Sequence, residues 1–324
     1  GNDHRLGANE APPAIISIYL GEQLDDVVQQ IIKTGSADHS LKGESLTTGV
    51  DTLPDFRKDA TDRNRTSPFA FTGNKFEFRM VGSKDSISGP NVVLNTIVAE
   101  AFKEACDILE KADDFEKEAK ALICKYLTEH QRIVFNGNGY TDEWVAEAEK
   151  RGLPNIRSMV EAIPALTTDK SVKLFEEFGV FTKAELESRA EIQYEAYVKA
   201  INIEAKTMID MAKKTIIPAV IKYTTSLADS IISVKACGVE PEVQTELLQK
   251  ISAHLKEAQK ALEELEMITA KAAAIEDMPT AARAYHDEVM PAMTALRTPV
   301  DAMEVLVDKK DWPMPAYSDL IFEV

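Results

Sequence analysis

The second half of the chain carries a long apolar repeat, which limits the folds available to the chain more than any other feature. Apolar side chains recur there at alternating steps of four and three, in two stretches separated by Cys237-Gly238-Val239. This spacing places one apolar stripe along a helix and is typical of a coiled-coil seam. The seam residues are Tyr194, Val198, Ile201, Ala205, Met208 and Ala212 in the first stretch and Leu248, Ile251, Leu255, Ala258, Leu262 and Leu265 in the second.

Residues that typically begin and end helices indicate that the repeat belongs to a set of three long helices. Thr182 and Glu185 form a capping box, which begins a helix that we expect to run towards Ala236 with a kink at Pro218. A third helix is expected from about residue 279 to 308, with interruptions at Pro291 and Pro299. Long helices joined by short turns predict an antiparallel bundle. We interpret its seams as core and its charges as solvated faces, and assign no chemistry to it.

Composition excludes several classes of partner. The net charge of −17 argues against a nucleic-acid partner, because phosphate neutralisation needs a basic patch. No stretch approaches the roughly 18 apolar residues of a membrane helix, so we expect no membrane partner. The three cysteines, Cys106, Cys124 and Cys237, form no Cys-x-x-Cys pair. They predict free thiols in a reducing cytoplasm rather than a zinc site or disulfides.

The first half of the chain mixes strand and helix signals. Residues 14–20 are mostly apolar and predict a buried strand, and residues 21–34 have helical spacing closed by Gly35. Residues 36–62 are rich in Ser, Thr, Gly and Asp and predict a long loop. A helix is then expected from Val92, with Asn91 as its N-cap, to about Phe135.

A short stretch with a period of two stands out within this half. Polar and apolar residues alternate strictly in Lys75-Phe76-Glu77-Phe78-Arg79, after a run with turn chemistry, so residues 68–80 predict a β-hairpin. We expect Phe76, Phe78 and Met80 to face a core. Lys75, Glu77 and Arg79 would then stand in a row on the other face, about 7 Å apart.

This row of cation, anion and cation has two interpretations. The spacing alone favours a solvated face with cross-strand charge pairs. The alternative is a site that handles phosphate, in which Glu77 holds a divalent metal while Lys75 and Arg79 neutralise substrate oxygens. Arg63 and Arg65 place two further guanidinium groups just before the hairpin.

Four ordered motifs decide between these interpretations. They are Arg5-Leu6 followed by Glu10-Ala11-Pro12, then Asn64-Arg65-Thr66, then the alternating stretch, then Gly89-Pro90-Asn91-Val92-Val93-Leu94-Asn95. Together they resemble the C-terminal part of the catalytic domain of glutamine synthetases. The segment between Pro13 and Arg63 and the helical extension are similar to the type III branch of that family.

The resemblance implies a fold class and a domain organisation. We expect an α+β protein in which residues 1–135 form the C-terminal part of a β-sheet catalytic domain, with an insertion at about 14–62. Residues 136–324 would form the helical extension. The chain has no initiator methionine, and we expect it to be a fragment of a longer protein.

The resemblance also implies the reaction and the site residues. Glutamine synthetases join ammonia to glutamate with ATP through a γ-glutamyl phosphate, using Mg²⁺ or Mn²⁺. By this resemblance, Glu77 would be a metal ligand, and Arg79 would contact the reacting carboxylate and the phosphate that moves onto it. Lys75, Arg65 and Arg63 would contact the nucleotide and its phosphates. Arg5 would bind the α-carboxylate of glutamate, and Glu10 would be a loop carboxylate that shields the intermediate and accepts a proton.

Two positions depart from the commoner branches of the family. Ala70 stands where those branches have an arginine, so either Arg63 supplies the missing charge or the hairpin has a different register. Lys75 also replaces an arginine, and it would act as a point charge without a bidentate fork.

Further expectations concern the whole protein. The family's other metal ligands would precede residue 1, so we expect the isolated chain not to turn over substrate. The resemblance implies a cytoplasmic homo-oligomer, a double-ring dodecamer, that takes glutamate, ammonia and ATP. Two alternatives stay open: a helical interaction and assembly module without catalysis, and a related ligase that joins glutamate to another amine.

Overall fold

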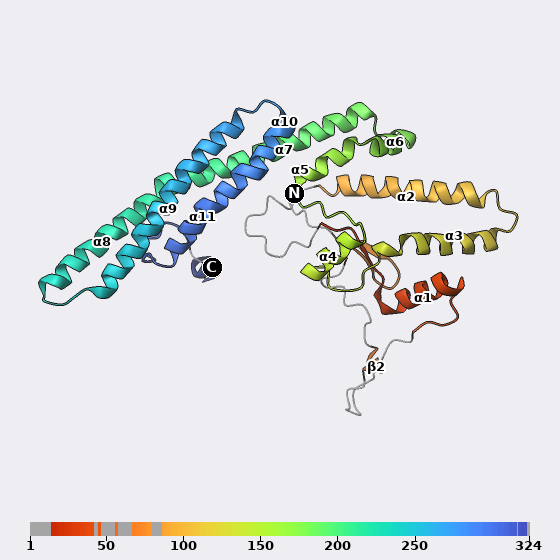
Figure 1. The fold of residues 1–324 in the computed structure, drawn as a ribbon, viewed down its shortest axis with the longest axis horizontal. Coiled ribbons are helices and arrows are strands. Elements are labelled where there is room, and N and C mark those ends of the chain that lie inside the picture. The colour runs from red at the N-terminus through yellow and green to blue at the C-terminus, as the bar shows by residue number, and fades with distance from the viewer. Residues whose placement is uncertain are drawn as a thin grey trace. The chain divides into compact units, whose positions relative to one another are not determined.

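The computed structural model of the protein describes residues 14–41, 45–46, 56–57, 67–79, 86–315 and 317–322. The chain divides into two compact units, Gly1–Leu186 and Glu187–Val324. It is mostly helical, and the described residues contain one three-stranded sheet and one two-stranded pair (Figure 1). None of the helices described is both long enough and apolar enough to span a bilayer.

The three-stranded sheet of the first unit has the order β1-β4-β5. Strand β1 (Ile18–Tyr19) runs parallel to β4 (Phe69–Phe71), and β4 runs antiparallel to β5 (Phe76–Phe78). Val134 adds a parallel bridge to Ile18. The strand predicted over residues 14–20 is therefore present, but its ladder covers two residues. The predicted loop at 36–62 contains a second pair, β2 (Ser45–Leu46) with β3 (Phe56–Arg57).

The predicted hairpin is confirmed, but the prediction of its buried face is wrong. Phe76 is 52% exposed, and its ring contacts Phe71 on the same face at a centroid distance of 5.3 Å. The buried face contains Tyr19, Ala70 and Glu77, which lie opposite one another across the three strands. Tyr19 is 5% exposed and Ala70 is fully buried. Met80 lies outside the described residues.

A core cluster joins the segment before β1 to residues distant in sequence. Ile15 lies three residues before β1 and is 1% exposed. It packs in a core cluster with Trp144, Ala148 and Leu153. The segment that follows residue 136 therefore belongs to the same unit as the sheet. The division into units at Leu186 does not test the domain boundary expected at residue 135, which concerned family domains and stays a prediction.

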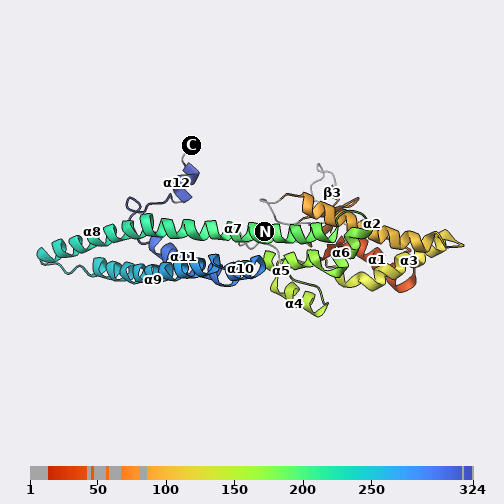
Figure 2. The same cartoon turned by 90° about the horizontal axis from the view of Figure 1, so that it is seen from above.

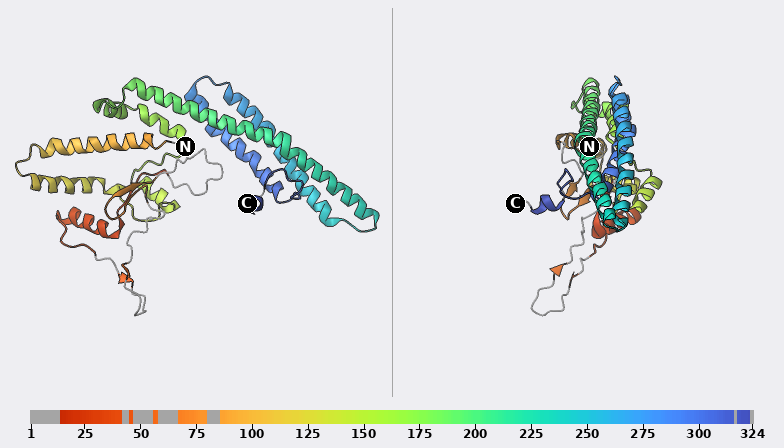
Figure 3. Two further views of the ribbon diagram at one scale, coloured as in Figure 1. Left: turned by 180° about the vertical axis from the view of Figure 1, so that it is seen from behind. Right: turned by 90° about the vertical axis from the view of Figure 1, so that its left-hand side faces the viewer.

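Three helices flank the sheet in the first unit. Helix α1 (Gly21–Thr34) ends as predicted at Gly35, whose φ of +79° is a left-handed conformation that favours glycine. The helix expected to run with few breaks from Val92 to about Phe135 consists of α2 (Ser88–Leu109) and α3 (Phe115–His130), and it begins before Asn91, which is therefore not its N-cap. Asp114 separates them because its side chain accepts a hydrogen bond from Lys117 N and caps α3. Helix α3 lies between α1 and α2 (Figure 3).

Short capped helices complete the first unit. They are α4 (Asp142–Lys150), α5 (Met159–Ala162) and α6 (Asp169–Glu177). The side-chain oxygens of Thr141, Ser158 and Thr168 cap their first turns, and Ser158 forms a full capping box with Glu161.

The second unit consists of long helices that pack through the predicted seams. Helix α7 (Lys183–Met211) begins at the Thr182–Glu185 capping box, as predicted. Helix α9 (Glu242–Ala273) packs against both α8 (Ile217–Ala236) and α11 (Met290–Glu304), as Figure 2 shows. Ile201, Ala205, Ile251 and Ala258 on these seams are fully buried. A short helix, α12 (Tyr317–Phe322), lies near the end of the chain.

Pro218, Pro291 and Pro299 lie in helical stretches of the second unit that continue past them. The interruption predicted at Pro299 is absent, because Pro299 lies inside α11. A π-helical turn at Ala212–Ile216 joins α7 to α8 shortly before Pro218, and another at Tyr285–Val289 joins α10 (Met278–Ala284) to α11 before Pro291. Proline lacks an N–H and its ring collides with the carbonyl of the preceding turn. A widened turn absorbs both problems and keeps the helix continuous.

Candidate functional site

The hairpin brings together three of the site residues predicted from sequence. Lys75 directly precedes β5, Glu77 lies within it and Arg79 directly follows it. The other four, Arg5, Glu10, Arg63 and Arg65, lie outside the described residues. The roles assigned to all seven stay predictions.

Two charges on the hairpin, those of Lys75 and Glu77, form a long and exposed ion pair. Lys75 Nζ lies 3.8 Å from Glu77 Oε1, and the two side chains are 66% and 29% exposed. A pair of this length and exposure is worth at most about 1 kcal/mol. Arg79 is fixed through its backbone, because its N–H donates to Pro68 O at 2.7 Å. The hairpin therefore presents a point cation and a hard oxygen ligand whose mutual attraction is weak enough for a ligand to replace.

The register of the hairpin explains the departure at position 70. Ala70 lies directly opposite Glu77 and is fully buried between β1 and β5. A side chain as long as arginine does not fit there without displacing the neighbouring strands. The predicted alternative in which Arg63 supplies the missing charge falls outside the described residues.

Two buried serines connect the hairpin to the rest of the first unit. Ser17 Oγ donates to Ser67 Oγ at 2.8 Å, and Ser67 Oγ donates to the Phe135 carbonyl at 3.1 Å. Both serines are almost completely buried. Because Ser67 stands just before β4, these bonds fix where the hairpin leaves the sheet.

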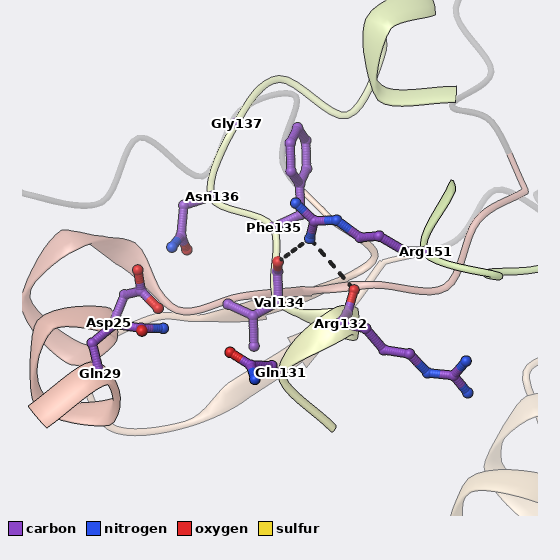
Figure 4. A pocket seen from close by; sticks show the side chains of 9 residues that line it. All are labelled: Asp25, Gln29, Gln131, Arg132, Val134, Phe135, Asn136, Gly137 and Arg151. Carbon is purple, nitrogen blue, oxygen red and sulfur yellow. Dashed lines mark hydrogen bonds between the residues drawn. The ribbon is translucent and has the colours of Figure 1, made fainter. Parts of the chain in front are cut away.

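A polar cavity of about 490 Å³ lies beside this connection (Figure 4). It is lined by Asp25, Gln29, Gln131, Arg132, Val134, Phe135, Asn136, Gly137 and Arg151. Asn136 Oδ1 accepts hydrogen bonds from Leu20 N at 2.9 Å and Gly21 N at 3.1 Å, and so closes the start of α1. Gly137 has no room for a side chain, since an added Cβ would lie 2.6 Å from the Phe135 ring.

The opposite wall of the cavity is organised around Arg151. Its Nη1 donates to Val134 O at 2.9 Å and to Arg132 O at 3.4 Å, and its Nε donates to Glu147 Oε1 at 2.7 Å. The hydrogen bond from Arg151 holds the pKa of Glu147 below its usual value. The guanidinium also lies 5.4 Å above the Trp144 ring, which stacks on Phe135 at 3.7 Å.

Sequence reasoning did not find this cavity. Asp25 and Gln29 are one turn apart on α1, whose apolar spacing indicates a helix and no site, and Arg151 follows α4. The one local signal is Asn136-Gly137-Asn138-Gly139, a run with turn chemistry directly after the expected helix end at Phe135. The polar Asn136 directly after apolar Val134 and Phe135 could have indicated a capping residue beside a strand.

Comparison with known proteins gives consistent matches along the whole chain. The family model for the glutamine synthetase C-terminal domain matches residues 118–235. A type-3 glutamine synthetase of Dictyostelium discoideum is 39% identical over 332 residues, covering 99% of this chain and 45% of that protein. A glutamine synthetase of Butyrivibrio fibrisolvens is 39% identical over 339 residues, covering 100% of this chain and 46% of that protein.

A third relative extends the pattern. A glutamine synthetase of Bacteroides fragilis (strain YCH46) is 34% identical over 334 residues, covering 99% of this chain and 46% of that protein. The chain therefore spans about half the length of the curated relatives it matches.

Proposed function

Because the chain belongs to the glutamine synthetase family, we propose that the full-length protein is an ATP-dependent glutamate–ammonia ligase. The similarity to proteins named glutamine synthetase extends over at least 99% of the chain. The observation that carries the proposal is the charged hairpin, in which Lys75, Glu77 and Arg79 follow one another at every second position. Phosphoryl transfer is mostly positioning and charge neutralisation, and these side chains suit both tasks.

The proposed reaction has two steps. The γ-carboxylate oxygen of glutamate attacks the terminal phosphorus of ATP, which forms γ-glutamyl phosphate and releases ADP. Ammonia then attacks the γ-carbonyl carbon, and phosphate leaves as the amide forms. The first step is needed because a free carboxylate is a poor acceptor for ammonia. Negative charge gathers on phosphate oxygens in the first step, so positive side chains at that point lower the barrier.

We assign the first step to cations on and beside the hairpin. Arg79 would contact the reacting carboxylate and the phosphate that moves onto it, because a planar guanidinium binds two oxygens at once. Lys75, Arg65 and Arg63 would contact the nucleotide. Lys75 suits this role because its ammonium is 66% exposed and only loosely paired with Glu77.

Glutamate and ammonia would be bound by the segment that precedes β1 in sequence. Arg5 would bind the α-carboxylate of glutamate. Glu10 would shield the intermediate from water and take a proton from ammonium, which gives the ammonia that attacks. This assignment rests on the motif residues alone, because both side chains lie outside the described residues.

Glu77 fits the role of one ligand to Mg²⁺ or Mn²⁺. Its carboxylate is 29% exposed and offers the hard oxygen atoms that these ions prefer. Within the described parts of the chain, no group of three or more His, Cys, Asp or Glu side chains could hold a metal ion. The remaining ligands would therefore come from other parts of the full-length protein. When bound, the ion would help to neutralise the charge of the phosphates.

Several wider properties belong to the same proposal. The full-length protein would act as a cytoplasmic homo-oligomer, a double-ring dodecamer. The first unit would contribute part of the active site, and the helical extension of residues 136–324 would contribute none of the reacting groups. The isolated chain would then be inactive.

Substitutions in the full-length protein test this proposal. Glu77→Ala and Arg79→Ala should each lower glutamine formation by about 100-fold or more, as expected for groups that stabilise a charged transition state. Glu264→Ala, at an exposed position on α9, is the matched control and should keep full activity. Oligomer size should be unchanged in all three variants. Full activity in both hairpin variants would favour the assembly-module alternative, and activity with another amine in place of ammonia would favour the related ligase.

A further inference from the structure

The cavity beside β1 is separate from the charged hairpin and has its own chemistry. Its walls come from α1, from residues 131–137 and from Arg151. None of Lys75, Glu77 and Arg79 lines it. Its volume of about 490 Å³ lies within the range of small-molecule sites.

Asp25 gives the cavity a specific need for a hydrogen-bond donor. Its Oδ1 atom is buried, and among the described residues no group donates a hydrogen bond to it. Buried carboxylate oxygens in folded proteins almost always accept a hydrogen bond. Gln29 lies one turn further along α1, so the two side chains share a face of that helix and both line the cavity. A bound ammonium group would satisfy Asp25.

Carboxamide groups between the two walls add further polar positions. Asn136 uses its Oδ1 atom to close the start of α1, which leaves its amide nitrogen as the group available to a ligand. Gln131 donates from Nε2 to Thr128 O at 3.3 Å, which leaves its carbonyl oxygen. The cavity therefore offers both a donor and an acceptor beside Asp25.

The other wall carries the guanidinium groups of Arg132 and Arg151, and the Glu147 carboxylate, paired with Arg151, balances one of these two positive charges. Figure 4 shows the Arg151 guanidinium beyond the Val134 carbonyl, on the side away from Asp25, while the Arg132 side chain points outward. The Nε and Nη1 atoms of Arg151 are held by Glu147 and by two carbonyls. Because these bonds fix the plane of the guanidinium, its second terminal nitrogen is preorganised to meet a carboxylate.

We propose that this cavity binds a free α-amino acid as a zwitterion, with its ammonium group on Asp25 and its carboxylate on the Arg151 side. A ligand with both charges matches a lining that is anionic at one wall and cationic at the other. A nucleotide fits less well, because Glu147 is paired with Arg151 and leaves this wall one net positive charge to neutralise a whole phosphate chain beside the Asp25 carboxylate. Val134 and Phe135 supply an apolar surface for the ligand's side chain.

Calorimetric titration of the 324-residue chain with each of the twenty amino acids tests the proposal, because every lining residue lies within the chain. At least one amino acid should bind with a Kd below about 1 mM. Its decarboxylated amine and its deaminated acid should each bind at least about tenfold more weakly, since each lacks one charge. If none of the twenty binds to the folded chain, the proposal is wrong.

Substitutions then locate the bound amino acid. Asp25→Asn keeps the shape of the side chain and removes its charge, and it should weaken binding by about tenfold or more. Gln29→Met should weaken binding less, and it provides a second test should the Asp25 variant lose its helical circular dichroism. Glu22→Gln, an exposed change on the same helix, is the matched control and should bind like the unchanged chain. Unchanged affinity in both cavity variants would place the amino acid elsewhere and overturn the proposal.

Discussion

The two units of this protein are held together in different ways. The second unit is a set of long helices whose seam residues repeat one contact many times, so its stability is spread along the helices. The first unit has strands of two or three residues, and individual side-chain hydrogen bonds, such as those of Asn136 and Ser67, connect its segments that lie far apart in sequence. The charged hairpin and the polar cavity both lie in the first unit. Repeated apolar contacts stabilise the helices of the second unit, whereas individual polar contacts position the functional groups of the first unit.

The chain offers a separate reporter for each unit. It has two tryptophans, Trp144 in the first unit and Trp312 in the second, and both are mostly buried. Incorporation of fluorotryptophan and fluorine NMR during urea unfolding would follow the two units separately. If the two units are stabilised in different ways, a substitution in one unit should mainly change the urea concentration at which the tryptophan resonance of that unit reports unfolding.

The largest expected effect is the loss of a seam side chain. Ile201 on α7 is fully buried, so Ile201→Ala should lower the stability of the second unit by about 2–5 kcal/mol. Ile203→Ala on the same helix is the control, since Ile203 is 65% exposed and its loss should change stability by no more than about 0.5 kcal/mol. The Trp312 resonance should report the difference. Equal effects at the two positions would mean that the predicted seam does not form the core.

A smaller effect is expected from the serine connection in the first unit. Ser67→Ala leaves the buried Ser17 hydroxyl and the Phe135 carbonyl without Ser67 as a partner, which should cost about 1–3 kcal/mol. The Trp144 resonance should shift to lower urea, while Ser36→Ala at an exposed position should leave it unchanged. A shift seen only at Trp312 would contradict the assignment of this connection to the first unit.

Helix capping in the first unit should contribute less again. Ser158 is buried and forms both halves of a capping box with Glu161 at the start of α5. Ser158→Ala should therefore cost about 1 kcal/mol, measured from the Trp144 transition in urea. Ser158→Asp, which keeps a capping oxygen, should recover part of that loss. No loss in the alanine variant would show that the cap is not needed to hold α5.

The smallest expected effect concerns pH. The pKa of Glu147 is held below its ordinary value of 4.5 by the hydrogen bond from Arg151. A carboxyl with a lowered pKa in the folded state stabilises that state above pH 4.5, and this stabilisation is lost as the pH falls through the folded-state pKa. Glu147→Gln should flatten the acid side of a plot of Trp144-monitored stability against pH. An unchanged plot would mean that solvent screens the pair completely.

The sequence predicts the second unit better than the first, for a physical reason. A seam of buried residues is a local repeat, so the spacing around Ile201 or Ile251 reveals it directly. The hairpin is also local, and its alternation with a Gly73 turn was enough to predict it. Alternation shows that a strand has two faces but does not say which one is covered. Which face is covered depends on residues far from the hairpin in sequence, such as Tyr19 on β1, which lies opposite Ala70 and is 5% exposed.

The candidate functional residues differ in the same way: some belong to a local motif, and others are brought together only by the fold. The resemblance to a family identified Lys75, Glu77 and Arg79, because their motif is contiguous. The cavity joins Asp25, Asn136 and Arg151, which come from three segments with no common motif. Only the fold brings them together, so no local pattern could have predicted the buried oxygen of Asp25.

The central claim is that Glu77 on the hairpin contacts the metal used in phosphoryl transfer. Anomalous diffraction from crystals of the full-length protein with Mn²⁺ and a non-hydrolysable ATP analogue tests it directly. The account predicts an anomalous peak about 2.0–2.6 Å from a Glu77 carboxylate oxygen, with Arg79 facing the terminal phosphate. Bound nucleotide and Mn²⁺ at a position that Glu77 and Arg79 do not reach would contradict it.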